Sequence, residues 1–339
     1  MKAFIINNPQ DFEFCEIPVP ACGASEVLIR VLTVGICGSD VEIMNGDRPR
    51  THVHYPIVPG HEWVGRVVRV GRDIQDLRVE QLVVVEGIIH CGQCANCLKG
   101  ATNLCLSSYD EIGFTRNGAF SEFVVAPRRL VHAVTLASGV QLRELPLVEP
   151  SACAVNAGML AAIEAGQTVA VVGGGTVGLL VLQYAALHRP GRLVMFDKDP
   201  SRLFLAKELG ATESASAESA AAYAGMFDVV IEAAGSPRAV ECSFALARKG
   251  GRVVLLGIAG QNRMCEVASD IFVLNGLQVF GVFSYTSKAF RTAAELISQG
   301  KIRGAPLIDR EVPFEETARA IKAVGRGNLA RPKIIVNME

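Results

Sequence analysis

The feature that most constrains the fold of this chain is a glycine triplet, Gly173-x-Gly175-x-x-Gly178, between a short apolar run and a longer apolar segment. Residues 168–172 are predicted as a β-strand, and the segment after the triplet as a helix. In this setting the first glycine permits a tight turn, the second admits a pyrophosphate, and the third lets helix and strand pack closely. The helix N-terminus adds N–H groups and positive partial charge. The pattern predicts a dinucleotide-binding βαβ unit.

An acidic residue at the end of the next predicted strand strengthens this interpretation. Asp197 follows the triplet by roughly 20 residues, where a carboxylate can accept hydrogen bonds from the adenosine ribose hydroxyls. It would repel the extra phosphate of NADP, so we predict NAD, although Lys198 and Arg202 could weaken that preference. The alternative is that Asp197 is a turn or helix-capping residue before Pro200. The predicted cofactor-binding residues are Gly173, Gly175, Thr176, Val177, Gly178, Asp197, Lys198 and Arg202.

The spacing of apolar residues differs between two parts of the chain. Up to about Arg129 the apolar runs are short, β-branched and interrupted by Gly and Pro, which predicts a barrel-like all-β region. From about Gly166, strands alternate with helices, which predicts a doubly wound parallel sheet of about six strands. We expect residues 211–225 to form an exposed loop or helix at the sheet's edge. The fold class is α/β, with one domain at 1–150 completed by 286–339 and a nucleotide-binding domain at 151–285.

Four cysteines lie in one short segment, Cys91-x2-Cys94-x2-Cys97-x7-Cys105. Four thiolates so close together match the tetrahedral coordination of Zn2+, and such a site has no open position for a substrate. Chance clustering and two disulfides are the alternatives, but C-x2-C spacing strains a disulfide. We predict a structural zinc, with the chemistry elsewhere.

A second set of residues has the composition of an open zinc site. Cys37 in GICGSD, His61 and Glu62 in PGHEWVG, and Glu149 in LVEPSACA are each ambiguous alone. Together they provide ligands from both sides of an expected cleft between the domains. A catalytic zinc with a free position can bind an alcohol oxygen, lower its pKa and prepare the carbon for hydride loss to nicotinamide.

Two polar residues after Cys37 have two possible roles each. Ser39 could pass the hydroxyl proton outward, or it could only cap the helix predicted to begin near DVEIM. Asp40 could hold the other ring nitrogen of the ligand histidine, or it could be a carboxylate at the helix start.

Composition excludes some classes of function. Lys and Arg number 33 against 34 Asp and Glu, for a net charge of −1 without a basic run, so a nucleic-acid partner is not expected. The first residues lack the apolar core of a signal peptide, and no stretch approaches about 18 apolar residues, so we expect no membrane partner and a cytoplasmic protein.

The motifs GICGSD, GHE, the four-cysteine segment, the EP turn, GGGTVG and FDKDPSR together resemble the zinc-dependent medium-chain dehydrogenases along essentially the whole chain. The resemblance implies a GroES-like catalytic domain formed by both chain ends, a Rossmann domain between them, and a homodimer or homotetramer. It also implies that Cys37, His61 and Glu62 are zinc ligands, with Glu149 bound directly or through water. The four cysteines would hold the structural zinc.

Within that family the chain is most similar to the polyol branch, which includes sorbitol, galactitol-phosphate, sugar-acid and threonine dehydrogenases. Glu62 follows His61, and Glu149 stands where simple alcohol dehydrogenases carry a cysteine. One departure is Glu42, where many relatives carry a histidine, which puts their usual proton path in doubt. Arg48, Arg50 and Arg116 are candidates for contact with an anion, although solvated surface arginines are the commoner outcome.

The sequence therefore predicts an oxidoreductase with two zinc ions and NAD, which oxidises a secondary alcohol of a polyol, sugar acid or polyol phosphate to a ketone. One alternative substrate is an amino alcohol, as in L-threonine 3-dehydrogenases. Another alternative is a non-catalytic NAD-binding sensor or scaffold, in which zinc only braces the fold.

Overall fold

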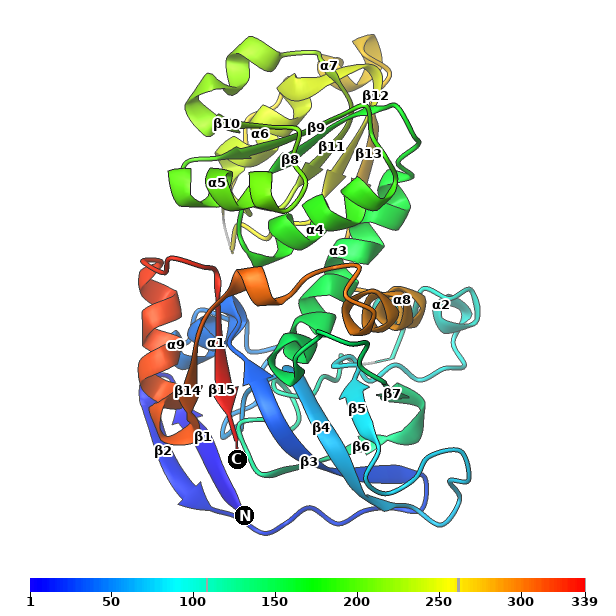
Figure 1. Ribbon diagram of the computed structural model, residues 1–339, viewed down its shortest axis with the longest axis vertical. Coiled ribbons are helices and arrows are strands. Elements are labelled where there is room, and N and C mark those ends of the chain that lie inside the picture. Colours follow the sequence, from blue (N-terminus) through cyan, green and yellow to red (C-terminus); the bar gives the residue numbers. More distant parts are fainter. Residues whose placement is uncertain (108, 261–262, 339) are drawn as a thin grey trace. The chain divides into compact units, whose positions relative to one another are not determined.

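The chain folds into two compact units (Figure 1). The computed structural model describes residues 1–107, 109–260 and 263–338. The first unit comprises Met1–Glu149 together with Thr286–Glu339, and the second comprises Pro150–Tyr285.

The second unit is built on a six-stranded sheet in the order β10-β9-β8-β11-β12-β13, with every pair parallel. The strands are β8 (Thr168–Val172), β9 (Arg192–Asp197), β10 (Glu213–Ser216), β11 (Phe227–Glu232), β12 (Ala247–Leu255) and β13 (Gln278–Gly281). The helices are α3 (Val148–Ala161), which begins just before the unit, α4 (Thr176–Leu187), α5 (Pro200–Glu208), α6 (Pro237–Leu246), α7 (Asp270–Leu274) and the 3-10 helix η4 (Ala217–Tyr223). The predicted doubly wound fold is confirmed.

The strand order reverses next to the glycine loop, because β8 has β9 on one side and β11 on the other. Ligands of doubly wound sheets bind at such a reversal, beyond the carboxyl ends of the strands. One local prediction was wrong: residues 213–216 form the edge strand β10 rather than a loop or helix. Small Ser and Ala residues carry little strand propensity, and here backbone pairing with β9 decides the conformation.

The first unit contains a seven-stranded sheet in the order β14-β15-β3-β4-β5-β7, with β6 also paired to β3, and a hairpin of β1 and β2. Its strands are β1 (Lys2–Asn8), β2 (Asp11–Glu16), β3 (Glu26–Gly35), β4 (Glu62–Val70), β5 (Leu82–Val85), β6 (Phe123–Pro127), β7 (Val131–Ala133), β14 (Ile308–Pro313) and β15 (Lys333–Asn337). Its helices are α1 (Gly38–Asn45), α2 (Ala95–Leu98), α8 (Ser287–Ser298), α9 (Thr317–Arg326) and the 3-10 helices η1 (Thr102–Leu104), η2 (Arg128–Leu130), η3 (Leu142–Leu147), η5 (Ala305–Leu307) and η6 (Phe314–Glu316).

Strand β3 organises this unit. It pairs with β4 on one side, and its ends pair with β6 and with β15 from the end of the chain. Val27, Ile29 and Val31 alternate along β3 and are buried in the core of the unit. The pairing of Gly35 with Glu62 brings the residues that follow β3 next to those at the start of β4.

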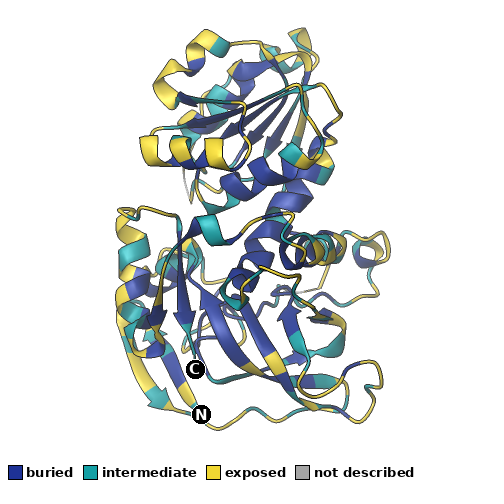
Figure 2. Ribbon diagram, viewed as in Figure 1, coloured by how far each residue is buried: buried dark blue, intermediate teal, exposed yellow. Residues whose placement is uncertain are grey.

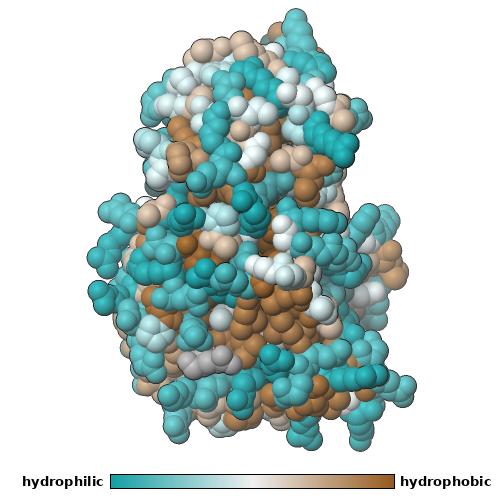
Figure 3. Space-filling model, viewed as in Figure 1, coloured by the Kyte–Doolittle hydropathy of each residue, from teal (hydrophilic) through white to brown (hydrophobic). Residues whose placement is uncertain are grey.

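Figure 2 shows buried strands in the middle of each sheet and exposed outer sides on helices such as α5 and α9. Hydrophilic side chains cover most of the face seen in Figure 3, with apolar residues visible between them. Among the described residues, no helix has both the length and the apolar character that a bilayer crossing requires.

Candidate functional site

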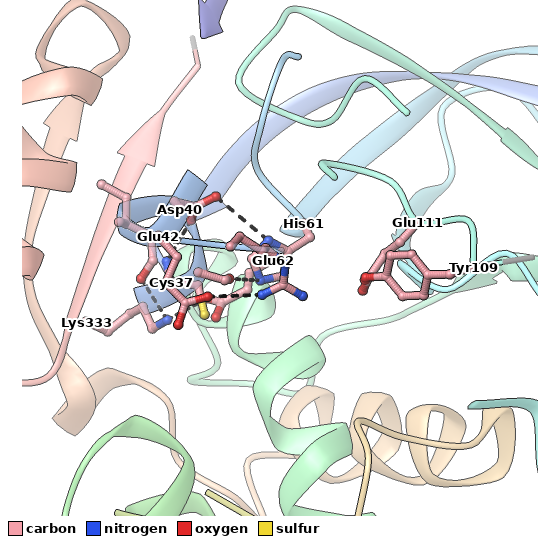
Figure 4. Close-up of polar contacts among 11 residues, drawn as sticks. Cys37, Asp40, Glu42, His61, Glu62, Tyr109, Glu111 and Lys333 are labelled. Carbon is pink, nitrogen blue, oxygen red and sulfur yellow. Dashed lines mark hydrogen bonds and ion pairs between the residues drawn. The ribbon is translucent and has the colours of Figure 1, made fainter. Parts of the chain in front are cut away.

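Three of the predicted zinc ligands converge in the first unit. Cys37 lies between β3 and α1, and His61 and Glu62 lie at the start of β4. The sulfur of Cys37, a ring nitrogen of His61 and a carboxylate oxygen of Glu62 all lie within 4.8 Å of one another (Figure 4). A Cβ on Gly35 would lie 2.5 Å from Oε2 of Glu62, so the space for this carboxylate depends on a glycine in β3. Thiolate, imidazole and carboxylate form a donor set suited to zinc.

Asp40 combines the two roles that the sequence left open. Its Oδ2 accepts a hydrogen bond of 2.8 Å from the backbone N–H of Cys37, and its Oδ1 lies 3.8 Å from Nδ1 of His61. Both Oδ1 and Nδ1 are buried, and neither has a hydrogen-bond partner within the described part of the chain. The carboxylate faces Nδ1 and so favours the tautomer that carries its proton there, which leaves Nε2 for a metal.

Ser39 lies on the metal side of the same imidazole. Its Oγ is 3.3 Å from Nε2 of His61. The hydroxyl is thus beside the nitrogen that would coordinate zinc, within reach of an alcohol bound there.

Sequence reasoning missed Lys333. This residue begins β15, and its Nζ lies 2.5 Å from Oε2 of Glu62 and 2.9 Å from the carbonyl oxygen of Ile36. Burial lowers the pKa of Lys333, but the charges of Glu62 and Cys37 outweigh burial and raise it, so the ammonium is retained. The available signal was a lysine directly before the apolar run Ile334–Val336.

Buried acidic groups outnumber the cations at this site. Burial raises the pKa of the Cys37 thiol to about 12, with the charge of Glu62 adding to the effect and that of Lys333 opposing it. Burial also raises the pKa of Glu149 well above its usual value, although His61 opposes the rise. The oxygens of Glu149 lie outside the group of three ligand atoms. Because several buried anions are costly without a compensating cation, a divalent ion fits the site electrostatically.

The four cysteines form a separate cluster on and around α2. The sulfurs of Cys91 and Cys97 lie 3.9 Å apart, and those of Cys94 and Cys105 lie 4.0 Å apart. Four sulfurs at the usual Zn–S distance of about 2.3 Å in a tetrahedron lie roughly 3.8 Å from one another. Backbone N–H groups of Gln93 and Cys94 donate to Cys91 and lower its pKa to about 6. All four are free thiols, so the arrangement fits a metal and not a pair of disulfides.

In the second unit, the glycine loop between β8 and α4 is tightly packed. Gly173 has a φ of 103°, and a Cβ there would lie 2.6 Å from the backbone nitrogen of Ala234. A Cβ on Gly178 would lie 1.7 Å from the carbonyl oxygen of Gly173, so the start of α4 can approach the loop only with glycine at this position. Thr176 and Val177 form the first turn of α4.

Asp197 binds the loop directly. Its Oδ2 accepts a hydrogen bond of 2.5 Å from the N–H of Gly174, and its Oδ1 accepts one of 2.8 Å from Asp199. With Gly173 and Lys198 it lines a cavity of about 290 Å³, which Ser236, Arg238 and Cys242 also line. Sequence reasoning missed these last three, because they come from α6 and the turn before it. Arg202 is buried behind the loop, with its Cβ close to Gly174 and its Nε 3.7 Å from a carboxylate oxygen of Asp199. It is not among the described residues that line the cavity.

A further group of side chains adjoins the metal ligands. The ring of Phe114 lies 4.7 Å from that of His61, and the guanidinium of Arg48 lies 4.2 Å from the centre of the Phe114 ring. Glu111 is buried and accepts a hydrogen bond from the hydroxyl of Tyr109 (Figure 4). Burial raises the pKa of Glu111 to about 7, although His61 and Arg48 oppose the rise.

Comparison with known proteins places these features in context. Residues 23–135 match the family model described as the alcohol dehydrogenase GroES-like domain, and residues 176–299 match the one described as zinc-binding dehydrogenase. A sorbitol dehydrogenase from Bacillus subtilis is 28% identical over 331 residues, which cover 95% of this chain and 93% of that protein. An L-threonine 3-dehydrogenase from Streptomyces coelicolor is 32% identical over 343 residues, which cover 96% of this chain and 97% of that protein.

Among solved structures, a protein from Sinorhizobium meliloti that was assigned as a zinc-binding dehydrogenase and crystallised with NADP has the same fold. Its TM-score is 0.91 at 30% sequence identity, and the match covers 99% of each chain.

The raised pKa of Glu111 predicts a pH-dependent stability difference. Since the folded protein binds this proton more tightly than the unfolded chain, the free energy of unfolding should fall as pH rises from 4.5, the usual pKa of a glutamate, towards 7. Glu111→Gln has no carboxyl proton to lose at this position. Its free energy of unfolding minus that of the wild type should therefore increase by up to about 3 kcal/mol as pH rises from about 5 to 8. Denaturant titrations at several pH values measure the difference.

The matched control is Glu315→Gln, because the side chain of Glu315 is largely exposed. Its stability difference from the wild type gives the baseline for the loss of an exposed carboxyl group. A constant difference for Glu111→Gln would show that the folded protein does not hold this carboxyl in its neutral form.

Proposed function

Because this chain belongs to the zinc-dependent medium-chain alcohol dehydrogenases, we propose that it oxidises a secondary alcohol of a polyol, sugar acid or polyol phosphate to a ketone, with NAD as the hydride acceptor. The observation that carries the proposal is the convergence of Cys37, His61 and Glu62 within 4.8 Å, a set of three protein ligands that leaves a position for an alcohol. A second zinc would be held by Cys91, Cys94, Cys97 and Cys105, and it would brace the fold without taking part in the chemistry.

Zinc held by Cys37, His61 and Glu62 would supply a Lewis acid that favours the alkoxide form of the alcohol, and NAD would accept the hydride. Asp40 orients His61 by facing its Nδ1, and Lys333 holds one oxygen of Glu62. Ser39 Oγ accepts the hydroxyl proton and passes its own to water. The net reaction converts an alcohol and NAD+ to a ketone, NADH and a proton.

The polar character of the site supports a substrate with several hydroxyl groups. The buried carboxyl groups of Glu149 and Glu111 interact electrostatically with His61, and a carboxyl group forms hydrogen bonds with hydroxyls in either protonation state. An amino alcohol such as L-threonine is the second candidate, supported by the similarity to an L-threonine 3-dehydrogenase. The non-catalytic sensor is disfavoured, because a scaffold has no need for a three-ligand site with a serine beside it.

The carboxylate of Asp197 in the nucleotide cavity supports NAD over NADP as the cofactor, since it would repel a 2′-phosphate. Lys198 lines the same cavity, and the similar protein from Sinorhizobium meliloti carries NADP, so both cofactors belong in the assay. A cytoplasmic location stays a prediction.

We also propose that the protein is a homodimer or a larger homo-oligomer built through the edge of the second unit. Strand β13 is the last strand of its sheet, so one of its edges lacks a strand partner in the described chain. Exposed apolar side chains gather on it and on α7, which leads into it, with exposed fractions of 82% at Val273 and 75% at Leu274. An exposed edge with apolar neighbours is a template for strand pairing, here with a second copy.

The assignment of the metal ligands predicts the behaviour of Cys37→Ala. Removing the thiolate should lower turnover by at least about a thousand-fold, because the Lewis acid is lost, while NAD still binds to the second unit. The assay follows NADH formation on hexitols, pentitols, polyol phosphates, aldonates and L-threonine, before and after chelation. NAD affinity is measured in parallel by calorimetry.

Cys15→Ala is the control, since Cys15 lies on β2 outside the ligand group. Undiminished turnover by Cys37→Ala would overturn the zinc assignment. NAD binding without turnover on any alcohol would favour the sensor.

The oligomer prediction concerns Leu274→Glu. A charge on α7 should shift the protein from the mass of two or more chains to that of one, as measured by light scattering during size-exclusion chromatography. Phe204→Glu is the control, because Phe204 is an exposed apolar residue on α5 in the same unit. Retention of the full mass by Leu274→Glu would exclude this edge as the interface.

A further inference from the structure

We propose that Arg48 is a specificity-determining residue, whose guanidinium binds the anionic group of the substrate while the reacting hydroxyl lies at Cys37, His61 and Glu62. The inference rests on the proposed function and narrows its substrate class to polyols that carry an oxyanion. The shared chemistry is that of a carboxylate, as in an aldonate, or of a phosphate, as in a polyol phosphate.

The position of Arg48 supports this role. Its guanidinium lies over the ring of Phe114 at 4.2 Å, and the ring of His61 lies 4.7 Å from the same ring. Arg48 is therefore separated from a proposed zinc ligand by one aromatic ring. Helix α1 links Arg48 to a second proposed ligand, Cys37, because it begins directly after Cys37 and ends at Asn45, three residues before Arg48. A substrate of several carbons could reach both.

The guanidinium is held in place before any ligand binds. The Arg48 side chain is only 18% exposed, and stacking on an aromatic ring fixes the plane of the guanidinium. Its Nε is buried without a hydrogen-bond partner among the described residues, and its Nη1 donates to Glu42 at 3.2 Å. A carboxylate or phosphate accepts two parallel N–H bonds from an arginine fork, so an oxyanion would supply the acceptor that Nε lacks.

Glu42 binds Nη1 and leaves the other side of the guanidinium, where Nε and Nη2 point the same way, to an oxyanion. Its side chain is 47% exposed, and an ion pair with such an exposed partner contributes little to stability. The carboxylate can therefore turn towards solvent when an anion binds the fork of Nε and Nη2, which reduces the repulsion between the two anions. This gives a role to the residue that stands where many relatives carry a histidine.

The two other arginines that the sequence suggested are placed differently. Arg50 is exposed and lies over Tyr55 at 4.8 Å, and Arg116 forms an ion pair with Asp110 at 2.7 Å. Among the described residues, neither Arg50 nor Arg116 is stacked on a ring that contacts a proposed metal ligand. Arg50 is thus a matched control within the same segment.

The test compares ligands that share a carbon skeleton and differ in the group at one end, on the zinc-loaded protein with NADH present so that no oxidation occurs. D-Glucitol, D-gluconate and D-glucitol 6-phosphate form one series, and the galactitol, mannitol and iditol series cover the other configurations. Dissociation constants come from calorimetry, with the fluorescence of Trp63 as a second readout, because Trp63 is the single tryptophan of the chain and adjoins Glu62. We expect at least one anionic ligand to bind about ten-fold or more tightly than its neutral polyol.

The variants separate anion binding from a structural role. Arg48→Gln should weaken binding of that anion by about ten-fold or more, and change binding of the neutral polyol by less than about two-fold. Arg48→Lys should give an intermediate value, because it keeps the charge and loses the fork. Glu42→Gln should tighten anion binding, and Arg50→Gln should leave it unchanged.

Whether the aldonate or the phosphate responds to Arg48→Gln identifies the anion. The inference is wrong if no anionic ligand binds more tightly than its neutral partner, or if Arg48→Gln weakens both equally. If neutral polyols bind and are oxidised with NAD while the anions are not, the proposed function stands and only this inference fails. If no member of any series binds or is oxidised, both fail.

Discussion

Lys333 and Glu62 form an ion pair in which the side chains are 3% and 1% exposed, with 2.5 Å between Nζ and Oε2. The pair connects residues 271 positions apart and so joins the last strand of the chain to the start of β4. Loss of either partner would leave an uncompensated buried charge, which is strongly destabilising. The metal site is consequently complete only when β15 has paired with β3, and both ends of the sequence contribute to it.

The same ion pair also affects the charge balance of the proposed metal site. One oxygen of Glu62 is bound to the ammonium, and we propose that the other one binds the metal. Cys37 and Glu149 add further acidic groups whose pKa values are raised by burial, because no fixed cation balances them fully. A divalent ion would relieve this excess. Arg48 lies over the ring of Phe114, which also contacts His61, at the margin of the same site. In this account the zinc ligands and the proposed substrate anchor share one local charge balance.

Much of this arrangement could be predicted because the important motifs are local in sequence. The glycine loop and the four cysteines are each contained in a short segment. The alternation of predicted strands and helices indicated the parallel sheet. Residues that act through long-range pairing could not be identified. Lys333 reaches Glu62 only through β15, and Arg238 reaches the nucleotide cavity only through the packing of α6. The burial of two arginines could not be predicted from the sequence either. Arg202 lies behind the glycine loop, and Arg48 is partly buried although a surface position is commoner for arginine.

The central claim is that zinc is bound by Cys37, His61 and Glu62 in addition to the four cysteines. Diffraction data collected on either side of the zinc absorption edge test it most directly, because the anomalous difference map locates zinc alone. The account predicts two peaks in each chain, one surrounded by Cys91, Cys94, Cys97 and Cys105 and one beside Cys37, His61 and Glu62. A peak at the four cysteines without a second one, in crystals grown with excess zinc, would contradict the claim.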